Sequence, residues 1–176
     1  MFRLLFALIL LTSMACGTPP ERTELLPGEI RLDTPVPDFS VETLAGDTLS
    51  SSDLKGQITV INFWATWCGP CVVEIPELVA LQEDWSDRPF QMIGVSMDEG
   101  GFDTIRPFVD DFHINYPQIM DPGPLGESFG GVYALPSTFV VNQDGIITSR
   151  YLGLFPLHDI QHELDAMVKA IEDGNS

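Results

Sequence analysis

The sequence predicts an α/β domain, and three observations lead to this fold class. Residues 58–64 (ITVINFW) form a β-branched and aromatic run typical of a buried strand. A helical pattern follows from Cys71, and a second apolar strand pattern at residues 90–97 precedes a second helical pattern. The stretch after Leu32, about 145 residues, is long enough for one domain with a sizeable core.

The first half of the domain begins with an N-terminal hairpin, predicted at residues 39–42 and 48–49 around a turn at 44–47. A short helical turn is expected at residues 51–54, ended by Gly56. The strand at residues 58–64 comes next and leads directly into a helix. The helical spacing is carried by Ile75, Leu78, Val79, Gln82 and Trp85.

The second half begins with the strand at residues 90–97 and a helix of about three turns over residues 102–112, marked by Phe102, Ile105, Phe108, Val109 and Phe112. The remaining predicted elements are, in order, a short strand at 116–120, a helical turn at 125–129, a hairpin of strands 139–141 and 146–151, and a closing helix at 157–171.

Two cysteines, Cys68 and Cys71, lie at redox spacing between the strand at 58–64 and the helix that follows. Pro70 suits a first helical turn, so Cys68 is expected at the helix start. Unpaired N–H groups and the positive end of the helix dipole favour a thiolate there, and the thiolate is the nucleophile. We therefore predict that Cys68 attacks, and that Cys71 then resolves the mixed disulfide by closing the Cys68–Cys71 bond.

Two other roles of this cysteine pair are less consistent with the sequence. A structural zinc site needs four ligands, but there is no second cysteine pair, and His113, His158 and His162 have no finger-like spacing. A purely stapling disulfide would close so small a loop that it would remove little unfolded-state entropy. His158 and His162 lie one helical turn apart, but Asp159 and Glu163 beside them are typical of a polar helix face, so we expect no metal.

The sequence resembles the TlpA/ResA group of membrane-anchored bacterial thiol-disulfide oxidoreductases, which includes CcmG-type proteins, from about Thr34 to the C-terminus. The motifs that carry the resemblance are residues 67–71 (WCGPC), Glu74, Pro76 at the kink of the family's first helix, and residues 135–139 (LPSTF). The resemblance implies a thioredoxin-like fold, with a central mixed β-sheet flanked by helices, in which residues 102–112 are the helical insertion of redoxin-type proteins.

Pro136 matches the cis-proline of that family, which lies against the cysteine pair and shapes the groove where a partner's backbone docks. A cis bond is far more frequent before proline than elsewhere. The alternative is an ordinary trans turn proline ahead of the strand at 139–141. The residues expected to contact substrate in this groove are Trp67, Gly69, Pro70, Leu135 and Pro136.

Glu74 is the third predicted catalytic residue, with Cys68 and Cys71. Ordinary thioredoxins carry a buried aspartate in the strand before the cysteines, and here that position is the neutral Asn62. The resemblance assigns proton transfer to Glu74, because a nearby carboxyl can take up and release protons as the disulfide opens and closes. The alternative is a solvated carboxylate on an exposed helix face.

The N-terminal residues indicate export. One positive charge, Arg3, precedes an apolar run that is shorter than the roughly 20 residues of a membrane span. Cys16 follows the small residue Ala15 and resembles the lipid-attachment cysteine of bacterial lipoproteins, although Ser13 stands where that pattern usually has Leu. Lipidation would leave no stray third thiol, whereas a plain secreted form or an uncleaved anchor would.

The predicted organisation follows from these features. It comprises a signal peptide at 1–15, a flexible lipid-anchored linker at 16–33 that is rich in Pro, Thr, Glu and Gly, and the redox domain at 34–176.

The charge balance is strongly acidic, with 26 Asp and Glu against 8 Lys and Arg and a formal net charge of −18. This balance disfavours nucleic acid and anionic lipid surfaces as partners and weakly favours basic ones. Solubility alone, or adaptation to an unusual ionic setting, would account for it as well.

Together these features predict a tethered thiol-disulfide oxidoreductase in a bacterial cell envelope, facing the periplasm or exterior, that acts on disulfides of exported proteins. Gly69-Pro70, the thioredoxin dipeptide, and the family resemblance point to a reductase that needs no small-molecule cofactor. In the family, such reductases receive electrons from a membrane thiol carrier and serve cytochrome c maturation by reducing apocytochrome c. We expect a monomer.

Two other functions stay open. A redoxin-type thiol peroxidase with antioxidant activity would carry a threonine where this chain has Ala65. A copper-binding or scaffolding module would place a histidine near the cysteines or Pro136, and no histidine is close to them in sequence.

Overall fold

The structure is a computed structural model that describes residues 24–121 and 123–174. Its main sheet has six strands, and a smaller sheet pairs β2 (Ser40–Glu42) with β3 (Thr48–Ser50). The six strands are β1 (Glu29–Pro35), β4 (Ile58–Trp64), β5 (Phe90–Ser96), β6 (Gln118–Met120), β7 (Ser137–Val141) and β8 (Ile146–Leu152). The helices are η1 (Ser51–Leu54), α1 (Gly69–Asp84), α2 (Phe102–Asp111), α3 (Leu125–Ser128) and α4 (Leu157–Glu172).

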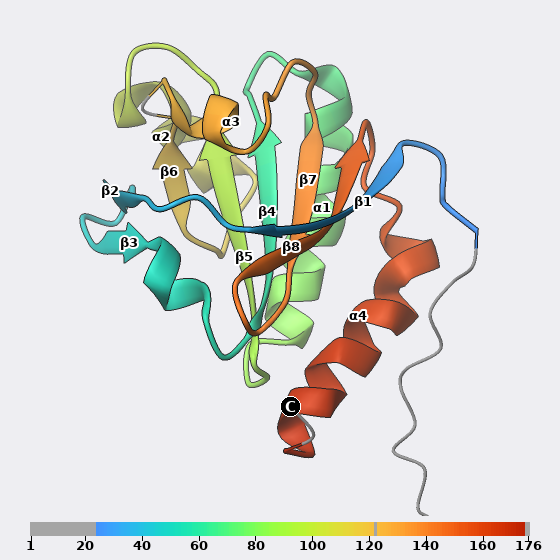
Figure 1. Ribbon diagram of the computed structural model, residues 1–176. Helices are drawn as coiled ribbons and strands as arrows, with labels where there is room; N and C mark the ends of the chain where they lie inside the picture. The colour runs from blue at the N-terminus through green and yellow to red at the C-terminus, as the bar shows by residue number, and fades with distance from the viewer. Residues whose placement is uncertain (1–23, 122, 175–176) are drawn as a thin grey trace, which may run out of the picture.

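The main sheet is mixed, with the strand order β1-β8-β7-β4-β5-β6. β4, β5 and β6 run parallel, whereas β7 is antiparallel to β4 and to β8 (Figure 1). The carboxyl ends of β4 and β5 therefore meet the amino end of β7 at one edge of the sheet. The predicted α/β fold with a central mixed sheet is confirmed.

The core lies on both faces of the sheet, and β4 is buried along its whole length. Ile58 and Val60 pack with the apolar sides of α1 and α4, and Ile61 and Phe63 pack on the opposite face with η1 and α3. Because both faces are covered, the strand is apolar throughout instead of alternating. This is why residues 58–64 carry so clear a strand signal.

The structure adds one strand that the sequence did not predict. β1 begins at Glu29, inside the segment 16–33 expected to be linker, and pairs antiparallel with β8. It is an edge strand with several exposed positions, and prolines flank it, so its apolar signal is weak. The predicted signal peptide and Cys16 lie outside the described residues. Within the described part of the chain, no helix combines the length and apolar character of a membrane span.

Candidate active site

The two cysteines form a disulfide at the start of α1, with an S–S distance of 2.08 Å. Cys68 is the N-cap residue of the helix, and its Sγ accepts a hydrogen bond of 3.3 Å from the Cys71 backbone N–H. This places the sulfur of Cys68 among the unpaired N–H groups of the first turn, as the sequence predicted. Cys68 is 5% exposed and Cys71 is 0% exposed, so only Cys68 presents its sulfur toward a partner.

The loop between β4 and Cys68 is held in place by Asp98, which lies just beyond β5. Its carboxylate accepts hydrogen bonds from the Thr66 backbone N–H at 2.9 Å, the Thr66 hydroxyl at 2.6 Å and the Ser96 hydroxyl at 2.9 Å. Three bonds to one carboxylate fix the backbone on the amino side of Trp67 and Cys68. The sequence analysis did not identify Asp98, because its partner Thr66 is 32 positions away in the chain.

A second loop approaches the disulfide from β7. Its Leu135–Pro136 peptide bond is cis, as predicted. Ser137 pairs with Phe63 in the sheet, so Pro136 lies next to the end of β4 and close to the start of α1. The Pro136 carbonyl accepts a hydrogen bond of 2.9 Å from the Gly153 N–H, which ties the segment after β8 to the same end of the sheet.

Behind the cysteines, Glu74 lies in the core and is 4% exposed, so it is not a solvated carboxylate. Its Oε1 accepts a hydrogen bond of 2.8 Å from Asn62 Nδ2, and its Oε2 accepts one of 2.9 Å from the Phe155 backbone N–H. Asn62 Nδ2 also donates to Thr138 Oγ1 at 2.9 Å. The carboxyl group therefore connects α1, β4, β7 and the segment between β8 and α4.

Burial raises the pKa of Glu74 from 4.5 to about 7, which is the largest effect on this group. The hydrogen bonds from Phe155 and Asn62 oppose this shift because they favour the charged form, and the charge of Glu77 adds to it. Tyr116 faces the same group, and burial together with the Glu74 charge raises the pKa of its hydroxyl. Glu74 can thus gain or lose a proton near neutral pH.

In front of the cysteines lies a cavity of about 550 Å³. Four of the predicted substrate-contacting residues line it with Cys68, namely Trp67, Gly69, Pro70 and Leu135. The structure adds Met97, Val132, Tyr133 and Ala134 to this wall. Most of these side chains are apolar, so the cavity offers an apolar surface beside the sulfur of Cys68.

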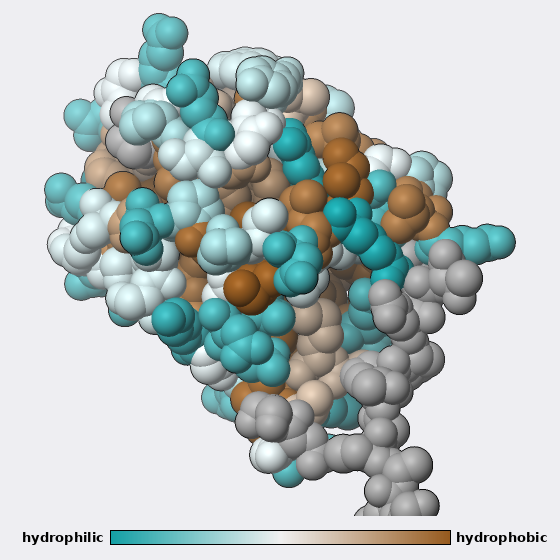
Figure 2. Space-filling model, viewed as in Figure 1, coloured by the Kyte–Doolittle hydropathy of each residue, from teal (hydrophilic) through white to brown (hydrophobic). Residues whose placement is uncertain are grey.

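Large apolar side chains are also exposed on the surface, and two of them, Trp67 and Tyr133, line this cavity. Trp67 is 70% exposed and Tyr133 is 90% exposed, and Val73 on α1 and Leu154 after β8 are exposed as well. Figure 2 shows a hydrophobic strip over the ends of β8 and β1, where Leu152 and Ile30 are exposed. Sequence reasoning did not identify Tyr133, although its position three residues before Pro136 was a usable signal.

The sequence predicted no metal site, and this prediction concerns which side chains lie close enough together to act as ligands. Among the described residues, no group of three or more His, Cys, Asp or Glu side chains is arranged to hold a metal ion. The two candidate histidines, His158 and His162, lie on α4.

A redox disulfide at the start of a helix, opposite a cis-proline on a mixed sheet, defines a thiol-disulfide oxidoreductase of the thioredoxin fold. The family model described as the AhpC/TSA family matches residues 32–150. The chain belongs to this family, and within it resembles the TlpA/ResA group, as the sequence motifs predicted.

Individual relatives agree with this assignment. The chain is 30% identical to the thioredoxin-like protein YneN of Bacillus subtilis over 130 residues, which is 73% of this chain and 76% of YneN. It is 28% identical to the thiol-disulfide oxidoreductase ResA of Bacillus thuringiensis over 143 residues, or 81% of this chain and 80% of ResA. A thiol:disulfide interchange protein of the thioredoxin family from Chlorobium tepidum superposes with a TM-score of 0.70 and 31% identity, over 78% of this chain and 97% of that one.

Proposed function

We propose that this protein is a tethered reductase that opens disulfides of exported proteins in a bacterial cell envelope. The observation that carries the proposal is the unequal burial of the two cysteines beside an open apolar cavity. A partner's disulfide can reach Cys68 through that cavity, while Cys71 is enclosed behind it.

The chemistry follows in two exchanges. In the reduced protein, the Cys68 thiolate attacks one sulfur of the client disulfide, forms a mixed disulfide and releases the other client sulfur as a thiolate, which takes up a proton. Cys71 then loses its proton and attacks Cys68 Sγ, which releases the second client thiol and closes the Cys68–Cys71 bond seen here. Two electrons pass from the protein's dithiol to the client.

Glu74 is the group placed to accept the proton of Cys71. It lies three residues further along α1, hence on the same side of the helix, and its pKa of about 7 suits exchange of a proton near neutral pH. The carboxyl group then returns this proton to solvent or to the client thiolate that the second exchange releases.

The position in the cell is the second part of the proposal. The first fifteen residues act as a signal peptide, and lipid on Cys16 anchors the mature chain with the redox domain facing the periplasm or exterior. The segment between Cys16 and β1 is the tether. The family resemblance supports a membrane thiol carrier as electron donor and apocytochrome c as one client.

The experiment uses the full chain expressed in a bacterial envelope. Cys71→Ser should accumulate mixed disulfides with exported proteins, and the Cys68→Ser/Cys71→Ser variant is the matched control that should trap none. In the same cells the wild-type protein should be found in membranes with a lipid on Cys16, and Cys16→Ala should lose that lipid. Trapped cytoplasmic proteins, or a mature chain without lipid by mass spectrometry, would contradict the cell-envelope part of the proposal.

A further inference from the structure

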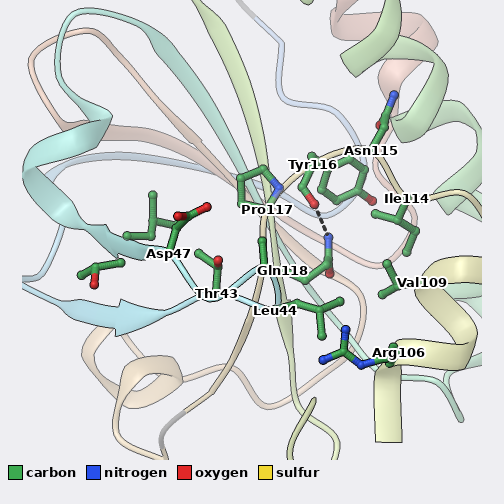
Figure 3. Close-up of a pocket in the computed structure, with 13 residues that line it drawn as sticks. Thr43, Leu44, Asp47, Arg106, Val109, Ile114, Asn115, Tyr116, Pro117 and Gln118 are labelled. Carbon is green, nitrogen blue, oxygen red and sulfur yellow. Dashed lines mark hydrogen bonds between the residues drawn. The ribbon is translucent and has the colours of Figure 1, made fainter. Parts of the chain in front are cut away.

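A second cavity, of about 460 Å³, lies away from the disulfide, at the β6 edge of the main sheet. Three parts of the chain enclose it (Figure 3): the turn between β2 and β3, helix α2, and the segment that leads into β6. The turn is fastened to the sheet edge, because the Leu44 N–H donates to the Gln118 carbonyl at 2.8 Å and Thr43 forms a bridge with Ile119. The cavity therefore has fixed walls, and its volume lies within the range of small-molecule sites.

The walls combine apolar surface with one cationic group. Leu44, Val109 and Pro117 supply apolar surface, and Figure 3 shows the Arg106 side chain reaching from α2 toward Leu44. Of the described residues that line the cavity, only Arg106 carries a positive charge. Its guanidinium makes no ion pair with any residue in the ranges 24–121 and 123–174. In a chain with a net charge of −18, an arginine that pairs with no acidic residue of the described ranges is available to an anionic ligand in the cavity.

The inner wall of this cavity is continuous with the redox core. The Gln118 side chain accepts a hydrogen bond of 2.9 Å from Trp64 Nε1 and donates one of 3.2 Å to the Tyr116 carbonyl. The Gln118 side chain packs directly against Gly94 of β5, where a Cβ would lie 2.2 Å from the Gln118 amide oxygen, so only glycine leaves room for it. Trp64 packs in one apolar cluster with Cys68 and Cys71. A ligand against Gln118 would therefore change the surroundings of the Trp64 indole.

We propose that this cavity binds a small organic monocarboxylate with an apolar body. The carboxylate pairs with the Arg106 guanidinium, whose two-pronged geometry matches carboxylate oxygens, and the body lies against Leu44, Val109 and Pro117. The single guanidinium balances one negative charge on the ligand. The carboxylate of Asp47 on the opposite wall would repel a ligand that carries two or more negative charges. This inference goes beyond the proposed function and does not depend on it, because binding is measured without any redox turnover.

The test is calorimetric titration of the oxidised protein with two probe acids, octanoate and 4-phenylbutyrate, each compared with its neutral amide. One acid has an alkyl body and the other an aryl body. The acid that binds more tightly therefore shows which kind of apolar body the cavity accommodates. We expect at least one acid to bind about ten-fold or more tightly than its amide. It should also shift the NMR signal of the Trp64 indole N–H, which reports binding next to Gln118.

Matched variants locate the site. Arg106→Gln should weaken the acid about ten-fold, to the level of its amide, whereas Lys55→Gln, which removes an exposed cation outside the cavity, should leave affinity unchanged. Leu44→Trp fills the cavity while keeping Arg106, and it should abolish binding of acid and amide alike. The proposal is overturned if neither acid binds, if Arg106→Gln binds as the wild type does, or if Lys55→Gln loses as much affinity as Arg106→Gln.

Discussion

Behind the Cys68–Cys71 pair lies a buried polar network, whereas in front of it lies an exposed apolar surface. The network consists of Glu74, Asn62 and Thr138, all nearly inaccessible to solvent. The front surface is dominated by Trp67 and Tyr133, both largely exposed. In most proteins the distribution is the reverse, with polar groups outside and aromatic ones inside. The inversion suggests a division of labour, in which the rear handles protons and the front binds the partner.

The largest expected effect is the difference between removing the front cysteine and removing the rear one. Cys71→Ser removes the resolving sulfur, so catalytic turnover with a disulfide-bonded peptide should be lost while a mixed disulfide through Cys68 forms and persists. Non-reducing electrophoresis and peptide mass spectrometry measure this. Cys68→Ser is the control, and trapping by that variant to an equal extent would show that the rear sulfur, not the front one, meets the partner.

The next effect concerns the rear network and the pH dependence of folding. The folded pKa of Glu74, about 7, is above its ordinary value of 4.5, so the folded state prefers the protonated carboxyl. The resulting stabilisation is complete below about pH 4.5 and is lost as the pH rises through 7, amounting to roughly 3 kcal/mol.

Denaturant unfolding of the oxidised protein from pH 4.5 to 7.5 tests this sign. Glu74→Gln should remove that part of the pH dependence, and Glu83→Gln, which changes an exposed carboxyl of the same helix that does not act on Glu74, should leave it. Identical pH profiles for the wild type and Glu74→Gln would mean that the buried carboxyl does not titrate in this range.

A smaller effect of the same residue acts on the cysteines. Glu74→Gln removes a negative neighbour and should lower the pKa of Cys68, since like charge disfavours the thiolate. Exchange with a protein disulfide near pH 7 should slow several-fold, because a proton-transfer group is lost and a thiolate of lower pKa is a weaker nucleophile. Thiolate absorbance and alkylation rate across pH measure both, with circular dichroism to check the fold. If neither quantity changes, the rear network has no role in catalysis.

The smallest expected effect concerns the front. Trp67→Ala and Tyr133→Ala should each raise KM for a client peptide a few-fold and leave kcat nearly unchanged, because they remove binding surface without touching the reacting sulfurs. Tyr133→Phe should keep the wild-type KM. Ile30→Ala, an exposed apolar residue on edge strand β1, is the control. A fall in kcat with constant KM would place these rings in the chemical step instead.

Local signals in the sequence were sufficient to place Cys68 at the helix start and to predict nearly every element, whereas the cis bond before Pro136 was predicted from the family resemblance. The apolar run at residues 58–64 predicts a buried strand, and Pro70 predicts a helix start. β1 was not predicted, because an edge strand pairs with one neighbouring strand only and needs little apolar surface.

The contacts between segments that are distant in the sequence were not predicted either. Asp98 reaches back to Thr66, and the Phe155 N–H comes to Glu74 across 81 positions of the chain. No local pattern encodes such pairs, since only the folded topology brings them together. The family resemblance pointed to Glu74, but only its burial shows why its carboxyl should titrate near neutral pH.

Asn62 gives the rear of the site a further property. Its Nδ2 donates to Glu74 and Thr138, while its Oδ1 is buried without a hydrogen-bond partner among the described residues. When Glu74 takes up a proton on Oε1, a half-turn of the Asn62 amide presents Oδ1 as the acceptor, and the Thr138 hydroxyl can switch from accepting to donating. A neutral amide at this position can therefore pair with either protonation state of Glu74, as donor to the carboxylate through Nδ2 or as acceptor from the protonated carboxyl through Oδ1.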